Sequence, residues 1–143
     1  ARLNRSLHRT RVDNRTYVCF CMGELDIAGR RFRLTNAACP YPFHFLAATG
    51  EVKEMQVDAY PLGVRDGTVY TAIEMMLELG DRVVFCSDGI AESTNVQEEM
   101  CGFERTAETI RAGCVEDLSA EALIDRLIGA VQGFAGDVPQ GMI

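Results

Sequence analysis

The chain has 143 residues, of which 48% are hydrophobic and 24% are charged. This composition is that of an ordinary globular protein, and the length allows one sizeable core. The net charge of −7 argues against a nucleic-acid-binding surface, because neutralising phosphates requires clustered Lys and Arg. No apolar run is long enough for a transmembrane helix, and the Arg-rich start lacks the features of a signal peptide. We therefore expect a single cytoplasmic domain over residues 1–143.

The charges are unevenly distributed along the sequence. The first 35 residues carry eight Arg against three acidic residues, so this end is about +5 and the remainder about −12. The basic end is either an interaction arm or the solvated face of a helix, and the solvated face is the simpler interpretation.

The six cysteines form no CxxC pair and no zinc-like set with histidine. Most of them lie in apolar runs, so we interpret them as small buried hydrophobic residues in a reducing compartment. A nucleophilic role for Cys39 would need a base such as His44. His44 alternates with two phenylalanines in an expected strand, which favours a surface position on a hairpin.

The N-terminal two thirds of the chain predicts a short helix followed by antiparallel strands. Leu3 and Leu7 have the spacing of an amphipathic helix that ends near residues 13–14. Strands are expected over residues 16–25, 31–34, 43–47, 52–57, 68–77 and 82–87. The first and last of these strands have apolar residues at both odd and even positions, which is typical of strands covered on both faces. Gly29 in the first turn is free to take a positive φ, and residues 79–81 form another tight turn.

After residue 87 the hydrophobic period changes from two to 3.6. One helix is expected over residues 103–112, ending at Gly113. A second begins at Ser119, with Leu118 and Leu123 as a hydrophobic staple and Gly136 beyond its end. Its buried stripe is expected to comprise Leu123, Leu127, Val131 and Phe134, widened by Ile124 and Ile128. Antiparallel strands followed by helices indicate an α+β fold.

The most informative segment runs over residues 83–93, Val-Val-Phe-Cys-Ser-Asp-Gly-Ile-Ala-Glu-Ser. A buried strand that ends in Asp88, with Gly89 allowing a sharp turn, would hold a carboxylate at the end of a rigid sheet. Mg²⁺ and Mn²⁺ prefer such oxygen ligands. Asp-Gly is also a common turn dipeptide, so this segment alone leaves both interpretations open.

The segment around Asp88 is one of four that follow one another along the chain: Leu-Thr-Asn-Ala-Ala at 34–38, Pro-Leu-Gly-Val at 61–64, residues 79–92, and Gly-Phe-Glu-Arg at 102–105. Together they resemble the bacterial metal-dependent Ser/Thr phosphatases of the SpoIIE/RsbU type, a branch of the PPM (protein phosphatase 2C-like) superfamily. The resemblance extends from about residue 3 to about residue 140.

This resemblance implies an antiparallel β-sandwich flanked by helices, in four α-β-β-α layers and incomplete at both ends of this chain. It implies a two-metal cluster of Mn²⁺ or Mg²⁺ whose bridging water attacks phosphoserine or phosphothreonine. By position, Asp88 matches a metal-binding aspartate, and Gly89 matches the glycine that permits the turn.

The sequence also departs from the pattern of that family. The Gly-Asp-x-x-Gly-His-Gly motif is absent, and residues 138–143 lack the aspartates that the family has there. Asp137 stands too early for that role. Ala38 and Cys39 stand where the family has Gly and His. The chain is therefore expected to be a piece of an active phosphatase or a degenerate domain that has lost its site.

The resemblance implies a phosphorylated regulatory protein as substrate, typically the anti-sigma-factor antagonist of a partner-switching pathway. It also implies a sensor or receiver module upstream. The alternative is a catalytically degenerate module that keeps the fold and binds a regulatory protein.

Overall fold

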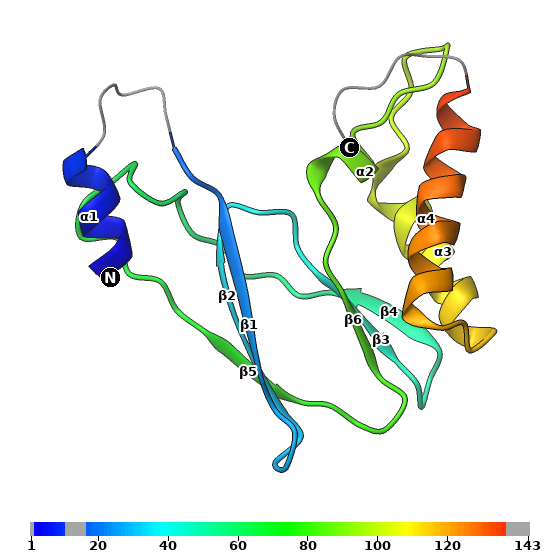
Figure 1. The fold of residues 1–143 in the computed structure, drawn as a ribbon, viewed down its shortest axis with the longest axis horizontal. Coiled ribbons are helices and arrows are strands. Elements are labelled where there is room, and N and C mark those ends of the chain that lie inside the picture. Colours follow the sequence, from blue (N-terminus) through cyan, green and yellow to red (C-terminus); the bar gives the residue numbers. More distant parts are fainter. Residues whose placement is uncertain (1, 11–16, 137–143) are drawn as a thin grey trace. The chain divides into compact units, whose positions relative to one another are not determined.

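A computed structural model describes residues 2–10 and 17–136 of the chain. The chain divides into two compact units. The first comprises Ala1–Tyr41 and Gln56–Leu77, and the second comprises Pro42–Met55 and Glu78–Ile143. Both units contain an antiparallel sheet and at least one helix, which confirms the expected α+β class (Figure 1).

The first unit contains helix α1 (Arg2–Thr10) and a sheet of strands β1 (Phe20–Asp26), β2 (Arg31–Ala37) and β5 (Ile73–Met76), in the order β1-β2-β5. The central strand β2 alternates as expected, because Phe32 and Leu34 are buried while Arg31 and Arg33 are exposed. The arginines pair across the strands with acidic residues of β1 and β5. One face of this sheet is therefore a charged surface, and the other contributes to a core.

Three predictions for this unit were wrong in detail. The strand expected at 16–25 begins at Phe20 among the described residues, where it is largely exposed and pairs with β2 alone. The strand expected at 68–77 is reduced to β5, because residues 68–72 belong to an irregular loop. In the first turn the positive φ falls on Arg30 (51°) and not on Gly29. The helix end expected at residues 13–14 lies outside the described residues.

The second unit has a sheet of β3 (Phe43–Leu46), β4 (Glu51–Glu54) and β6 (Arg82–Val84), in the order β4-β3-β6. The expected hairpin of β3 and β4 is confirmed, as is the turn at Gly80, whose φ is 91°. The strand expected in mid-sheet over residues 82–87 is instead the short edge strand β6. β3 begins directly after Pro42, so among the described residues β6 has no partner beyond Val84.

Helices α2 (Asp88–Ala91), α3 (Gly102–Val115) and α4 (Ala120–Ala135) complete this unit. Ser119 caps α4 as expected, and its side chain accepts a hydrogen bond from the Ala122 amide. The main core cluster joins β3, α3 and α4 and comprises Phe43, Phe45, Ile110, Cys114, Leu123 and Leu127.

Three expectations about the helices and cysteines need correction. Helix α3 continues through Gly113, where a Cβ would lie 2.6 Å from Leu123 Cδ1, so this glycine permits the close approach of α3 and α4. Ile124 and Ile128 are exposed and do not widen the buried stripe of α4. Of the six free cysteines, only Cys101 and Cys114 are buried.

Candidate functional site

The segment that carries Asp88 joins β6 to α2 in the second unit (Figure 1). Asp88 is the first residue of α2, and Ser87 precedes it in an extended conformation with φ −78° and ψ 163°. The expected direct junction of strand and carboxylate is interrupted by residues 85–87, in which Phe85 is half exposed. Asp88 therefore stands at a loop-to-helix junction and not at the end of a buried strand.

The Asp88 carboxylate is exposed to solvent. Its Oδ1 atom accepts a hydrogen bond from the Gly89 amide at 2.9 Å. Within the part of the chain that the structure describes, no other hydrogen bond or ion pair engages this carboxylate. One carboxylate oxygen is thus held by the backbone while the other is free to bind a ligand.

The turn beneath Asp88 is firmly anchored. The buried Ser93 hydroxyl donates to the Gly89 carbonyl at 2.6 Å, and the Glu92 amide donates to the Asp88 carbonyl at 2.8 Å. Ile90 is buried and packs in a small cluster with Cys101 and Val131. Because α2 has one face in this core, it presents Asp88 at a fixed position.

The implied two-metal cluster can be tested against these residues. Among residues 2–10 and 17–136, no group of three or more His, Cys, Asp or Glu side chains is placed to hold a metal ion. Gly89 already accepts a hydrogen bond from Ser93 at its carbonyl and donates its amide to Asp88. The described residues by themselves therefore do not form a two-metal site. Residues 138–143, where the resemblance implies further aspartates, lie outside the described part.

The loop that departs from the family pattern lies in the first unit. Asn36 is 1% exposed, and its side-chain amide bonds both backbone groups of Cys39, at 2.8 and 2.9 Å. Ala38 has a φ of 63°, in the left-handed region that favours glycine. The backbone thus keeps a conformation suited to the family's glycine although the side chain has changed.

His44 is not the surface residue that its alternation indicated. Its side chain is 12% exposed, and Nε2 donates to Asp81 Oδ2 at 2.9 Å. Asp81 is 6% exposed and also accepts from the amides of Ala47 and Glu78. Burial raises the pKa of Asp81, but the two amides and the hydrogen bond and charge of His44 outweigh it, so the pKa is lowered. This pair fixes the turn before β6 and was missed because its partners are 37 residues apart in sequence.

Comparisons with known proteins place these observations in a family. The family model described as "Stage II sporulation protein E (SpoIIE)" matches residues 1–140, so the chain belongs to the SpoIIE family. This confirms the resemblance found in the sequence. No curated protein gives a match.

Solved structures show the same fold at low identity. The SiaA-PP2C domain of Pseudomonas aeruginosa aligns with a TM-score of 0.81 and 18% identity, covering 96% of this chain and 53% of that one. The PP2C phosphatase domain of SpoIIE from Bacillus subtilis was solved with a fragment of its regulatory domain. It aligns with a TM-score of 0.67 and 15% identity, covering 94% of this chain and 43% of that one. The RsbU and RsbW domains of a Mycobacterium tuberculosis protein align with a TM-score of 0.64 and 22% identity, covering 85% of this chain and 32% of that one. The chain thus has the fold of PP2C domains and spans about half the length of the SiaA domain.

No helix among the described residues is long and apolar enough to cross a membrane.

Proposed function

We propose that this chain is part of a metal-dependent phosphatase that hydrolyses phosphoserine or phosphothreonine on a regulatory protein in the cytoplasm. The observation that carries the proposal is the exposed Asp88 carboxylate on an anchored turn, at the position where the resemblance implies a metal ligand, in a chain of the SpoIIE family. The substrate class proposed is the anti-sigma-factor antagonist, and a sensor or receiver module is proposed upstream. The Bacillus subtilis structure, which includes a fragment of a regulatory domain, supports that arrangement.

In this proposal residues 1–143 form one partial domain, and Asp88 acts with ligands from outside the described residues. Mn²⁺ or Mg²⁺ bound there would supply an activated water and neutralise phosphoryl charge. The part of Asp88 is to hold a cation at a fixed point. The part of Gly89 is to allow the turn, and Ser93 keeps that turn in place.

The test uses the full-length protein and the isosteric variant Asp88→Asn, which keeps an acceptor for the Gly89 amide. Mn²⁺ binding is measured by calorimetry, and hydrolysis is measured on a phosphoserine protein. We expect Asp88→Asn to weaken Mn²⁺ binding and to lower hydrolysis by about a hundredfold or more. Asp125→Asn, an exposed carboxylate on α4, is the matched control and should change neither quantity. Unchanged Mn²⁺ binding in Asp88→Asn would remove Asp88 from the metal site.

The second candidate is a catalytically degenerate module that binds a regulatory protein. It is favoured by the absence of a metal-holding group of three side chains among the described residues. A full-length protein that neither binds Mn²⁺ nor hydrolyses phosphoserine, yet retains a regulatory protein in a pull-down, would establish this alternative over the phosphatase.

A further inference from the structure

An apolar groove lies in the second unit between β6 and helix α4, and is named here the β6 groove. Its volume is about 620 Å³, and it is lined by residues 82–85 on one side and by side chains from residues 118–127 on the other. Most of the lining is apolar, and Phe85 and Ile124 within it are 50% and 55% exposed. Asp88 does not line the groove, so this surface is separate from the site described above.

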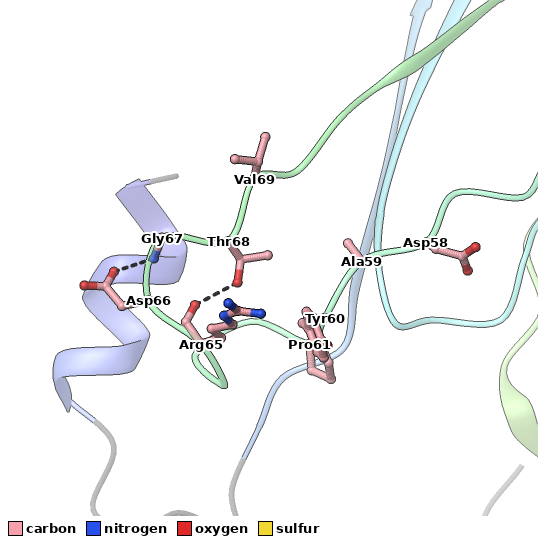
Figure 2. Close-up of a pocket in the computed structure, with 9 residues that line it drawn as sticks. All are labelled: Asp58, Ala59, Tyr60, Pro61, Arg65, Asp66, Gly67, Thr68 and Val69. Atoms are coloured by element: carbon pink, nitrogen blue, oxygen red, sulfur yellow. Dashed lines mark hydrogen bonds between the residues drawn. The ribbon is translucent and has the colours of Figure 1, made fainter.

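A hollow in the first unit differs from this groove in its charge. It lies on the irregular loop that precedes β5, the pocket loop (residues 58–69, Figure 2). Asn4 of α1 anchors this loop, because its Oδ1 accepts a hydrogen bond from the Gly63 amide at 2.8 Å. The charged residues that line the hollow are Asp58, Arg65 and Asp66. Charges of both signs complement neither an acidic nor a basic segment, so the hollow indicates no class of ligand.

The β6 groove, in contrast, presents no unpaired charge. Among the residues that line it, Arg82 is the only charged one. The Arg82 guanidinium pairs with Asp117 at 2.6 Å and donates a hydrogen bond to the Leu118 carbonyl. The groove therefore suits an apolar occupant, which buries its surface there without leaving a charge unpaired.

The strand that forms one wall of the groove has an open edge. β6 is the last strand in the order β4-β3-β6, and it pairs with β3 through residues 82–84. Beyond Val84, the amides of Phe85 and Cys86 donate no hydrogen bond to a residue that the structure describes. A row of backbone groups without partners, next to an apolar surface, is a template for a further strand.

The two helices that cover this sheet are wider than the sheet itself. Helix α3 packs on β3 and β4, and α4 packs beside α3 on the side of β6. A packed helix occupies a width of about 10 Å and a strand about 4.8 Å, so two helices side by side cover about four strands. The described sheet has three strands, and Ile124 and Ile128 of α4 are exposed. A fourth strand beside β6 would lie beneath these two side chains.

The sequence of β6 also agrees with a position inside a sheet. Residues 83–86 are Val-Val-Phe-Cys, with apolar side chains at both odd and even positions. Such runs are typical of strands that have neighbours on both sides and covers on both faces. Proteins pair or cover an apolar edge, because an open one leads to aggregation.

We propose that the open edge of β6 and the adjoining groove receive an apolar β-strand of the same protein from outside residues 1–143. The strand extends the sheet by one position, and its side chains pack on Phe85, Ile124 and Ile128. The same protein is favoured over a separate partner, because nearly half of the SiaA domain, which has this fold, lies outside the match and amounts to ample chain for further strands. This surface goes beyond the proposed hydrolysis, since it uses neither Asp88 nor a metal ion.

The direct test replaces Phe85 with the photo-crosslinking residue p-benzoylphenylalanine in the full-length protein. After irradiation the protein is digested, and the linked peptide is identified by mass spectrometry. We expect a link to a segment outside residues 1–143, in a product that keeps the mass of one chain. The same replacement at Leu79, which is 87% exposed in a turn outside the groove, is the matched control and should form no such link.

Two crosslinking results would overturn the proposal. A product with the mass of two chains would place a second copy in the groove. No link from position 85, or links only to residues 1–143, would show that no outside strand lies there. None of these results depends on Mn²⁺ binding or hydrolysis, so the strand and the proposed function can fail separately.

A second measurement decides the case in which the position-85 variant does not fold. Ile124→Thr changes a side chain that the strand buries, so it should lower the melting temperature of the full-length protein by about 5 °C or more. Val115→Thr, at a residue of α3 that is 60% exposed outside the groove, is the matched control and should lower it by about 2 °C at most. An equally small shift in both variants would leave Ile124 at an open surface and overturn the proposal.

Discussion

Replacing Asp81 with alanine removes the acceptor of three hydrogen bonds in the second unit. The carboxylate receives His44 Nε2 at 2.9 Å and the amides of Ala47 and Glu78 at 2.9 and 3.0 Å. A hydrogen bond to a charged group contributes about 1.5–3 kcal/mol, but the two amides belong to exposed residues and can regain water. The His44 imidazole is only 12% exposed and has less access to water. We therefore expect the free energy of unfolding to fall by about 2–4 kcal/mol.

Urea unfolding followed by circular dichroism measures this loss, with Asp125→Ala as the control at an exposed carboxylate. Hydrogen exchange gives an independent local measure, because the amides of Ala47 and Glu78 should exchange faster in Asp81→Ala than in the control. A loss below about 0.5 kcal/mol, the range of ordinary surface substitutions, would refute the argument that this carboxylate stabilises the turn before β6.

The lowered pKa of Asp81 also gives this contribution a pH dependence. The carboxyl binds a proton less readily in the folded state than in the unfolded state, where its pKa is about 3.9. The stabilisation is therefore fully present at higher pH and is lost as the pH falls below about 4 toward the folded pKa. Asp81→Asn does not titrate, so its unfolding free energy should decrease less than that of the wild type over this acid range.

Three further substitutions test other parts of the fold by thermal or urea unfolding. Asn4→Ala should cost about 2–4 kcal/mol and speed exchange of the Gly63 amide, because the buried side chain has three hydrogen-bond partners; unchanged exchange would contradict the anchoring of the pocket loop. Ala38→Gly should raise stability by about 0.5–1 kcal/mol, since it relieves a positive φ; a loss would show that no strain is stored there. Ser119→Ala should cost about 1 kcal/mol by removing the cap of α4, and an effect near zero would mean that water replaces it.

Only part of the candidate site could be predicted from the sequence. Asp88 and Gly89 are identified by a local dipeptide and by the order of the surrounding motifs, and the structure places them on an anchored turn. Ser93, which fixes that turn, belongs to the same segment but carries no sequence signal, because a serine in a loop is usually solvated. The role of Asp88 in binding a metal stays a prediction.

The sequence by itself determined the features that depend on neighbours along the chain. The spacing of Leu3 and Leu7 predicted α1, Ser119 predicted the start of α4, and the alternation around Phe32 predicted β2. Such patterns reflect the periods of helices and strands and the bonding of caps, which act over a few residues.

Only the tertiary structure decided which apolar strands are central and which form an edge. Two apolar runs indicated strands covered on both faces, yet among the described residues β1 and β6 each lie at the edge of a sheet, because the place of a strand depends on which strands pair and not on its composition. The roles of Asn4, His44 and Gly113 also depend on the tertiary structure, because the residues that they contact lie far away in the sequence or on other elements. The side chains of Asn4 and His44 have little access to water, and polar groups in such places are hydrogen-bonded to other groups of the protein. Asn4 therefore bonds the loop at Gly63, and His44 bonds Asp81, because the fold brings these groups together.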